Sequence, residues 1–117
     1  MKNKEFAIPL EKRTLPFGIR IIRLSTRLPN TLEGSVVKSQ ITRSGTSMGA
    51  NYREANRARS RADFKNRIAI CETEASETQY WLEVIKEVGW IPWEQLMADH
   101  AECSELLAIF TSIGKSG

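Results

Sequence analysis

The chain has 117 residues and a mass of 13.3 kDa, enough for one domain with a single hydrophobic core. Apolar residues make up 41% of the chain and charged residues 26%, the composition of an ordinary folded domain that is neither disordered nor membrane-spanning. No apolar run approaches the roughly 20 residues that cross a bilayer, and the N-terminal "MKNKEFAIPLEKR" lacks the apolar core of a secretory signal. We therefore expect a cytoplasmic protein with no membrane partner.

The net charge of +3 conceals a strong division along the chain. Residues 1–12 have a net charge of +1, and residues 13–67 hold 12 basic residues against three acidic ones. Residues 68–117 instead hold two basic and nine acidic residues. Such a division is typical of a nucleic-acid footprint, or of a chain whose two halves attract each other.

The first predicted helix follows residues 1–13, which we expect to form a flexible tail. Its apolar seam runs from Phe17 to Leu28 in steps of three and four residues, the period of an amphipathic helix. Three arginines share another face of this helix, and guanidinium groups bind phosphate bidentately. These candidates for nucleic-acid contact are Arg20, Arg23 and Arg27.

The second predicted helix begins at an expected N-cap, Asn30, with Glu33 in its first turn, and its seam continues to Ala58. Gly45 and Gly49 lie inside this helix, where each glycine costs about 0.8–1 kcal/mol relative to alanine. A phosphate-binding loop needs a preceding strand and a Lys-Ser/Thr pair, and this segment has neither. We expect the small residues to allow close helix packing instead.

A polar residue, Asn51, occupies the seam of the second helix. A buried amide must be hydrogen-bonded, and polar seam residues tend to fix the register of a bundle. The expected partners are charged residues on the second and third helices, namely Arg43, Glu54, Glu74 and Glu77.

The third predicted helix opens with a capping box, Ser60 and Asp63, and ends before Gly89, which suits the position after a helix C-terminus. Its seam runs from Phe64 to Ile85. Basic residues cluster where the second and third helices meet and are further candidates for phosphate contact. They are Arg57, Arg59, Arg61 and Lys65.

The fourth predicted helix has Pro92 in its first turn and a seam that includes His100, Cys103 and Leu107. His100 and Cys103 form an H-x-x-C pair that Cys71 could complete as a zinc site, but the chain has one histidine and no C-x-x-C motif. We expect these residues to pack in the core, with no metal and no cofactor. The sequence shows neither a nucleophile paired with a base nor the Glu-x-x-His motif of di-iron bundles, so no pattern in it indicates an enzyme.

Short connections join the four predicted helices, which favours antiparallel neighbours. The predicted fold class is therefore all-α, an antiparallel up-down four-helix bundle over residues 14–117. The third and fourth helices are apolar beyond one stripe, which favours self-association over a bulky monomer core. The additional apolar residues are Ile70, Trp81, Val84, Val88, Leu106, Ile109 and Ile113.

Residues 41–89 resemble the four-helix bundle proteins encoded in the intervening sequences of 23S rRNA genes. The similarity extends from about residue 14 to 114, with Met48 where isoleucine is commoner. The most recognisable block consists of Arg43, Ser47, Gly49, Ala50, Asn51, Arg53, Glu54 and Ala55, then Asp63-Phe64, Glu74-Ala-Ser-Glu77 and Trp81-Leu82. Within this block we interpret the polar residues, Gly49 and Trp81 as structural.

The resemblance implies a homopentamer of four-helix bundles with no established enzyme activity. It also implies kinship with the accessory protein of diversity-generating retroelements, a basic pentamer that binds nucleic acid and a reverse transcriptase. A reverse transcriptase or a ribosomal component is thus the candidate protein partner, beside further copies of the chain.

Two functions stay open at this stage. The basic residues favour a non-enzymatic oligomer that binds structured RNA or DNA through the phosphate backbone. The chain lacks the interleaved exposed aromatics that stack single-stranded bases. Against this, acidic residues of the expected fourth helix are available to neutralise the first helix; they are Glu94, Asp99, Glu102 and Glu105. The alternative is a protein-interaction scaffold without a nucleic-acid ligand, in which the bundle surface docks a partner and the arginines serve association between subunits.

Overall fold

The computed structural model describes the backbone of residues 2–116 and the side chains of residues 9–116. Four long helices account for most of the chain, and no strand occurs in the described residues. They are α1 (Lys2–Ser25), α2 (Leu32–Ala55), α3 (Arg61–Val88) and α4 (Met97–Lys115), with a 3₁₀ turn, η1 (Trp93–Gln95), before α4.

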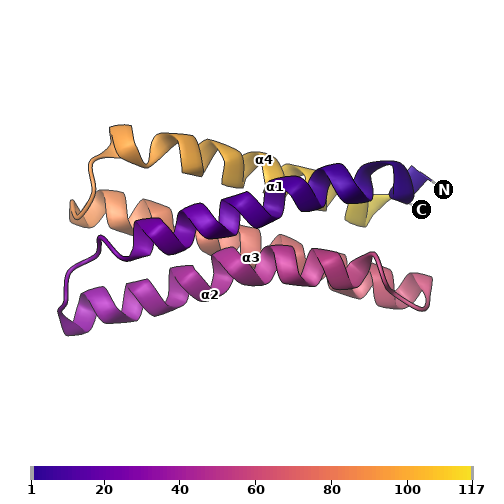
Figure 1. Cartoon of the computed structure of the whole chain (residues 1–117), viewed down its shortest axis with the longest axis horizontal. Helices are drawn as coiled ribbons and strands as arrows, with labels where there is room; N and C mark the ends of the chain where they lie inside the picture. The colour runs from indigo at the N-terminus through magenta and orange to yellow at the C-terminus, as the bar shows by residue number, and fades with distance from the viewer. Residues whose placement is uncertain (1, 117) are drawn as a thin grey trace.

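The helices run up and down along one long axis, so both chain ends and the α2–α3 turn lie at the same end of the molecule (Figure 1). The α1–α2 and α3–α4 connections lie at the other end (Figure 1). Each helix packs against the next, and α4 closes the bundle against α1. The predicted all-α up-down four-helix bundle is confirmed.

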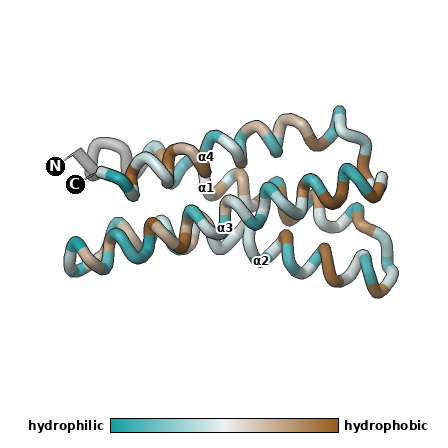
Figure 2. The backbone as a smooth tube through the Cα atoms, turned by 180° about the vertical axis from the view of Figure 1, so that it is seen from behind, coloured by the Kyte–Doolittle hydropathy of each residue, from teal (hydrophilic) through white to brown (hydrophobic). Residues whose placement is uncertain are grey.

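One hydrophobic core fills the space between the helices. In Figure 2, hydrophobic and hydrophilic residues alternate in short bands along every helix, as expected when one stripe of each helix is buried. All four helices contribute fully buried side chains to this core. The largest are Phe17, Ile21, Ile41, Met48, Ile68, Leu82, Ile85, Leu106 and Phe110.

The expected caps of α3 are confirmed. The Ser60 hydroxyl accepts a hydrogen bond from the Asp63 amide at 3.0 Å. Gly89 follows the helix in the left-handed region, with φ of 85°, and its N–H donates to the carbonyls of Ile85 and Lys86. Glycine adopts this conformation without the steric penalty that other residues have.

The expected N-cap of α2 is wrong by one residue. Thr31 has extended backbone angles and its hydroxyl accepts from the Gly34 amide at 3.0 Å. The Asn30 side chain instead accepts a long hydrogen bond, 3.4 Å, from the Lys38 ammonium group. Both residue types are good N-caps, so the pattern alone did not separate them.

Three helix boundaries also differ from expectation. α1 begins at Lys2 and runs through the boundary expected at residue 14, with Leu10 buried in the core. α2 ends at Ala55, before the expected Ala58. Pro92 precedes η1, and α4 starts only at Met97.

The seam of α4 is shifted relative to the predicted one. Leu106 is fully buried, whereas Leu107 is only half-buried and His100 lies at the edge of the core. The steps from Cys103 to Leu106 to Phe110 are three and four residues, and steps through Leu107 are four and three. Both satisfy the helical period, so spacing could not choose between the two leucines.

The small residues of α2 allow α1 to approach closely, as predicted. A Cβ atom on Gly45 would lie 2.7 Å from Ile21 Cγ2, and one on Gly49 would lie 3.1 Å from Thr14 Cβ. On the α1 side, a Cβ on Gly18 would lie 3.3 Å from the Gly45 carbonyl oxygen. The close contact between the two helices therefore depends on glycine at these positions, because any larger residue would add a side chain where the helices meet.

Candidate nucleic-acid interface

Two of the predicted arginines contact polar side chains at or just before the start of α4. Arg20 Nε lies 2.8 Å from Asp99 Oδ1, and Arg27 donates to the Gln95 side-chain oxygen. Two turns before Arg20, the guanidinium of Arg13 contacts two glutamates of α4. These contacts join the basic and acidic parts of the chain within one bundle, as expected from the sequence for Asp99, Glu102 and Glu105.

Arg13 makes the most extensive of these contacts. Its Nη2 lies 2.7 Å from Glu102 Oε1 and 2.7 Å from Glu105 Oε1, and its Nε donates to Glu102 at 3.0 Å. The hydrogen bond to Glu102, with support from Glu105, raises the pKa of Arg13 above its ordinary value although burial opposes this. Arg23, by contrast, is exposed and forms no ion pair within the described residues.

The corner between α2 and α3 carries the second group of candidate residues. Residues 53–67 hold six basic and two acidic side chains. Arg57 and Arg59 are exposed, Lys65 is half-buried, and none of the three forms an ion pair in the part of the chain that the structure describes. Arg61 donates to the Ser116 carbonyl oxygen at 2.8 Å and so ties the end of α4 to this corner.

One further residue adds positive charge at this end of the bundle. The exposed Lys115 is in the last turn of α4, which ends at the same end of the molecule (Figure 1). The structure thus brings Lys115 close to the corner, although the sequence analysis did not select it.

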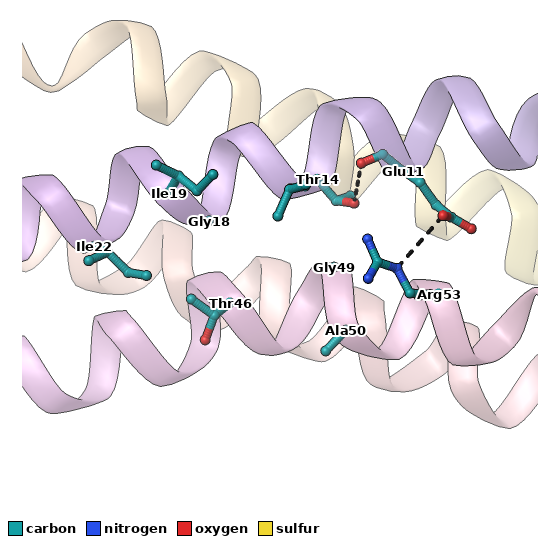
Figure 3. A pocket seen from close by; sticks show the side chains of 10 residues that line it. Glu11, Thr14, Gly18, Ile19, Ile22, Thr46, Gly49, Ala50 and Arg53 are labelled. Atoms are coloured by element: carbon teal, nitrogen blue, oxygen red, sulfur yellow. Dashed lines mark hydrogen bonds and ion pairs between the residues drawn. The ribbon is translucent and has the colours of Figure 1, made fainter.

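Arg53 lies at the border of this corner and faces α1. Its Nε is 3.8 Å from Glu11 Oε1 (Figure 3). Glu11 also accepts a 2.7 Å hydrogen bond from the Asn56 amide. The Arg53 side chain remains half exposed. Its role in the family block is therefore a contact between α1 and α2.

The polar residues of the family block form a ladder between α2 and α3. Arg43 donates to Glu74 at 3.1 Å and also to Glu77. One residue further along α2, the fully buried Thr78 and Ser44 hydroxyls are hydrogen-bonded at 2.8 Å. These contacts lie between two antiparallel helices and fix their register.

The expected partners of Asn51 are wrong. Its amide nitrogen donates to the Ser47 carbonyl and hydroxyl, each at 3.0 Å, and its oxygen accepts from Arg67 at 3.0 Å. Because α2 and α3 are antiparallel, residue 51 is level with residue 67, whereas Glu74 and Glu77 are level with Arg43. Helix direction and register together decide the pairing. Glu54, the remaining expected partner, is exposed.

Trp81 differs from the polar members of the family block because its side-chain donor lacks a hydrogen bond within the described residues. The side chain is half-buried and its ring packs edge-on against Tyr80, with ring centroids 4.9 Å apart. The indole Nε1 is buried without a hydrogen-bond acceptor in the described residues. Tyr80 itself is 57% exposed, so an aromatic pair lies on the outer side of α3.

A groove between α1 and α2 escaped the sequence analysis. It has a volume of about 210 Å³, and Gly18, Gly49 and Ala50 lie between its walls (Figure 3). Exposed apolar side chains of α1 line it at i, i+4 and i+7. These are Leu15, Ile19 and Ile22, which are 55%, 40% and 43% exposed. Their spacing was visible in the sequence, but the neighbouring seam of Phe17 and Ile21 matched the helical period equally well.

Both thiols pack in the core, as expected. Cys71 Sγ donates to the Met48 carbonyl at 3.5 Å, and Cys103 Sγ donates to the Ala75 carbonyl at 3.2 Å. Burial raises the pKa of each thiol to about 12. His100 Nε2 lies 2.8 Å from Glu83 Oε2, and the described residues include no group of three or more metal-ligating side chains.

The buried hydroxyl pair offers a test of the polar ladder. Thr78→Val should cost about 1–2 kcal/mol because it leaves the buried Ser44 hydroxyl without its partner across the helices. The double variant Ser44→Ala/Thr78→Val should recover most of this loss. Urea unfolding of both singles and the double measures the coupling, and purely additive effects would contradict it.

The comparisons place the chain among known proteins. Residues 10–112 match the family model of the 23S rRNA-intervening sequence protein. A search of curated proteins finds no match. Among the described helices, none combines the length and the apolar character needed to cross a membrane.

A solved structure agrees with both fold and family. It is described as a protein with unknown function from the S23 ribosomal protein family of Bacteroides thetaiotaomicron. The two proteins are 42% identical with a TM-score of 0.84, and the match covers 91% of this chain and 98% of the other. The chain belongs to the 23S rRNA-intervening sequence protein family.

Proposed function

We propose that this protein is a non-enzymatic, self-associating cytoplasmic bundle that binds structured RNA or DNA through its α2–α3 corner. The corner contacts the phosphate backbone by charge and does not read sequence. By resemblance to its family, we propose that the assembly is a homopentamer, which would present the corner several times. Repeated weak contacts then act together and raise the overall affinity.

The proposal rests on a difference between the two arginine groups in whether their guanidinium groups already contact other side chains. Arg20 of α1 already contacts Asp99 of α4, and Arg27, which follows α1, contacts Gln95 of η1. At the corner, Arg57 and Arg59 extend into solvent, and their guanidinium groups form no ion pair in the described part of the chain. We therefore assign the phosphate contacts to the corner, with Arg23 as the remaining candidate on α1.

The chemistry of the thiols supports a non-enzymatic role. A nucleophilic cysteine needs a lowered pKa and access to substrate. Cys71 and Cys103 have the opposite properties, because both are buried and their pKa values are raised. The family name and the S23 ribosomal description of the neighbour make ribosomal RNA the first ligand to try.

Binding should fall steeply with salt, because phosphate contacts release counterions. We expect fluorescence anisotropy with a labelled RNA hairpin to show binding at 50 mM salt that weakens at least tenfold at 200 mM, as roughly two or more phosphate contacts across an oligomer would give. Arg57→Glu/Arg59→Glu should reduce the affinity at 50 mM more than tenfold and flatten the salt dependence.

A matched control reverses the same charge elsewhere. Lys38→Glu reverses one basic residue on α2 away from the corner, and it should alter the affinity less than threefold, whereas the single change Arg59→Glu should alter it more. No detectable binding of the unmodified protein at 50 mM salt would exclude the proposal and favour the protein-interaction scaffold. An equal loss in both variants would instead show that binding is spread over the whole basic surface.

A further inference from the structure

The bundle exposes two different apolar faces on separate helices. One is the α1–α2 groove, lined by Leu15, Ile19 and Ile22. The other lies on the outer side of α3, where Tyr80, Val84 and Val88 follow one another at i, i+4 and i+8 and form a ridge. Tyr80 and Val88 are 57% and 54% exposed, and Val84 is half-buried.

The two faces have complementary shapes. The groove is hollow because Gly18, Gly49 and Ala50 have little or no side chain (Figure 3). The α3 ridge is bulky, since Trp81 lies beside it and stacks edge-on against Tyr80. At a rise of about 1.5 Å per residue, the apolar stripe of the groove extends about 10 Å and the ridge about 12 Å. Their lengths therefore match.

The helices that carry these faces have opposite charge. Residues 12–25 of α1 hold four basic and no acidic side chains, whereas residues 72–88 of α3 hold five glutamates and one lysine. On the ridge side, Glu83 and Glu87 are 54% and 77% exposed. On the groove side, Lys12 and Arg23 are exposed. Apolar contact between the two faces would thus be surrounded by favourable charge pairs.

We propose that the α1–α2 groove of one copy receives the α3 ridge of a second copy. This assignment rests on the self-association in the proposed function and names the two surfaces that produce it. The buried indole Nε1 of Trp81, which has no acceptor within the described residues of its own chain, lies next to this contact.

The symmetry of the assembly follows from this contact. Groove and ridge share no residue, so the contact is heterologous and each copy keeps one free groove and one free ridge. Such contacts continue from copy to copy until a ring closes, whereas a self-complementary patch stops at a dimer. The contact therefore predicts assemblies larger than dimers.

Variants of the full chain that block one face at a time test the assignment. Leu15→Glu/Ile22→Glu places acid in the groove opposite the acidic ridge, and Tyr80→Lys/Val88→Lys places base on the ridge. Light scattering should give an oligomer for the unmodified protein and the chain mass of 13.3 kDa for each variant. Mixing the two variants should give a species of twice the chain mass, because only one intact groove and one intact ridge remain.

Controls separate this contact from other causes. Met97→Glu changes a side chain that is 50% exposed outside both faces, and it should keep the unmodified mass. Circular dichroism verifies that each variant is helical, and the milder pair Ile19→Gln and Tyr80→Gln repeats the test without new charge.

The outcomes distinguish the contact from the proposed function. A monomeric unmodified protein would overturn self-association and the contact together. Variants that keep the oligomer mass, or a mixture that stays monomeric at about 100 μM chain, would overturn the contact alone. RNA affinity is measured separately, so a positive anisotropy result would leave the corner assignment standing in either case.

Discussion

Gly34→Ala should destabilise the bundle by about 3 kcal/mol or more, the upper end of what overpacking costs. A Cβ atom at this position would lie 2.0 Å from the Pro29 carbonyl oxygen and 2.9 Å from its carbonyl carbon. These are backbone atoms in the short connection between α1 and α2, so no side-chain rotation relieves the clash. The connection has to move, and the Thr31 cap with it.

The other helical glycines provide a graded control for this prediction. Gly45→Ala meets Ile21 Cγ2 at 2.7 Å, a side-chain atom that can shift, so we expect a loss of about 1–3 kcal/mol. Gly114→Ala meets only Ile68 Cγ2 at 3.7 Å and should stabilise α4 by up to about 1 kcal/mol. Urea unfolding of the three variants measures the order. A neutral Gly34→Ala would show that the α1–α2 connection is not packed as described.

The helical period identified the fold because it depends only on spacing. The predicted seam residues Phe17, Ile41 and Leu82 are fully buried, and the Ser60 and Gly89 caps occur where their residue types indicated. The errors fall where two choices satisfy the same rule. Leu106 and Leu107 both fit the period of α4, and Asn30 and Thr31 are both good caps.

The candidate site could be predicted only in part, because side-chain pairing depends on the relation between helices. The basic residues were visible from composition, but the contact of Arg20 with Asp99 needs the register of α1 against α4. The same is true of Asn51 and Arg67, which are joined by the register of α2 against α3. Sequence spacing describes one helix at a time, so it could not show which arginines contact side chains of another helix.

Cys71 and Cys103 should react with a thiol reagent about a thousand times more slowly in the folded protein than in urea. The thiolate is the reactive form, and burial raises each pKa from its ordinary 9.0 to about 12, which lowers the thiolate fraction about a thousandfold near neutral pH. Reaction with 5,5′-dithiobis(2-nitrobenzoic acid), followed by absorbance, measures both rates. A rapid native reaction of either thiol would show that its helix opens locally or that the thiol is accessible.

The raised pKa values also determine how stability depends on pH. Below pH 9 both states keep the thiols protonated, so the cysteines contribute no pH dependence. Between pH 9 and about 12 the unfolded thiols lose their protons while the buried ones retain them. Stability should therefore fall as pH rises, by about 1.4 kcal/mol per pH unit for each thiol.

Comparison with Cys71→Ala/Cys103→Ala separates this effect from the titration of lysine and tyrosine. The buried Tyr52, whose pKa burial also raises, is present in both proteins and cancels in the difference. We expect the free energy of unfolding of the unmodified protein to fall more steeply above pH 9 than that of the double variant. Equal slopes would mean that the thiols ionise as readily in the bundle as in the unfolded chain. The close packing of Cys71 of α3 against α2, and of Cys103 of α4 against α3, would then be wrong.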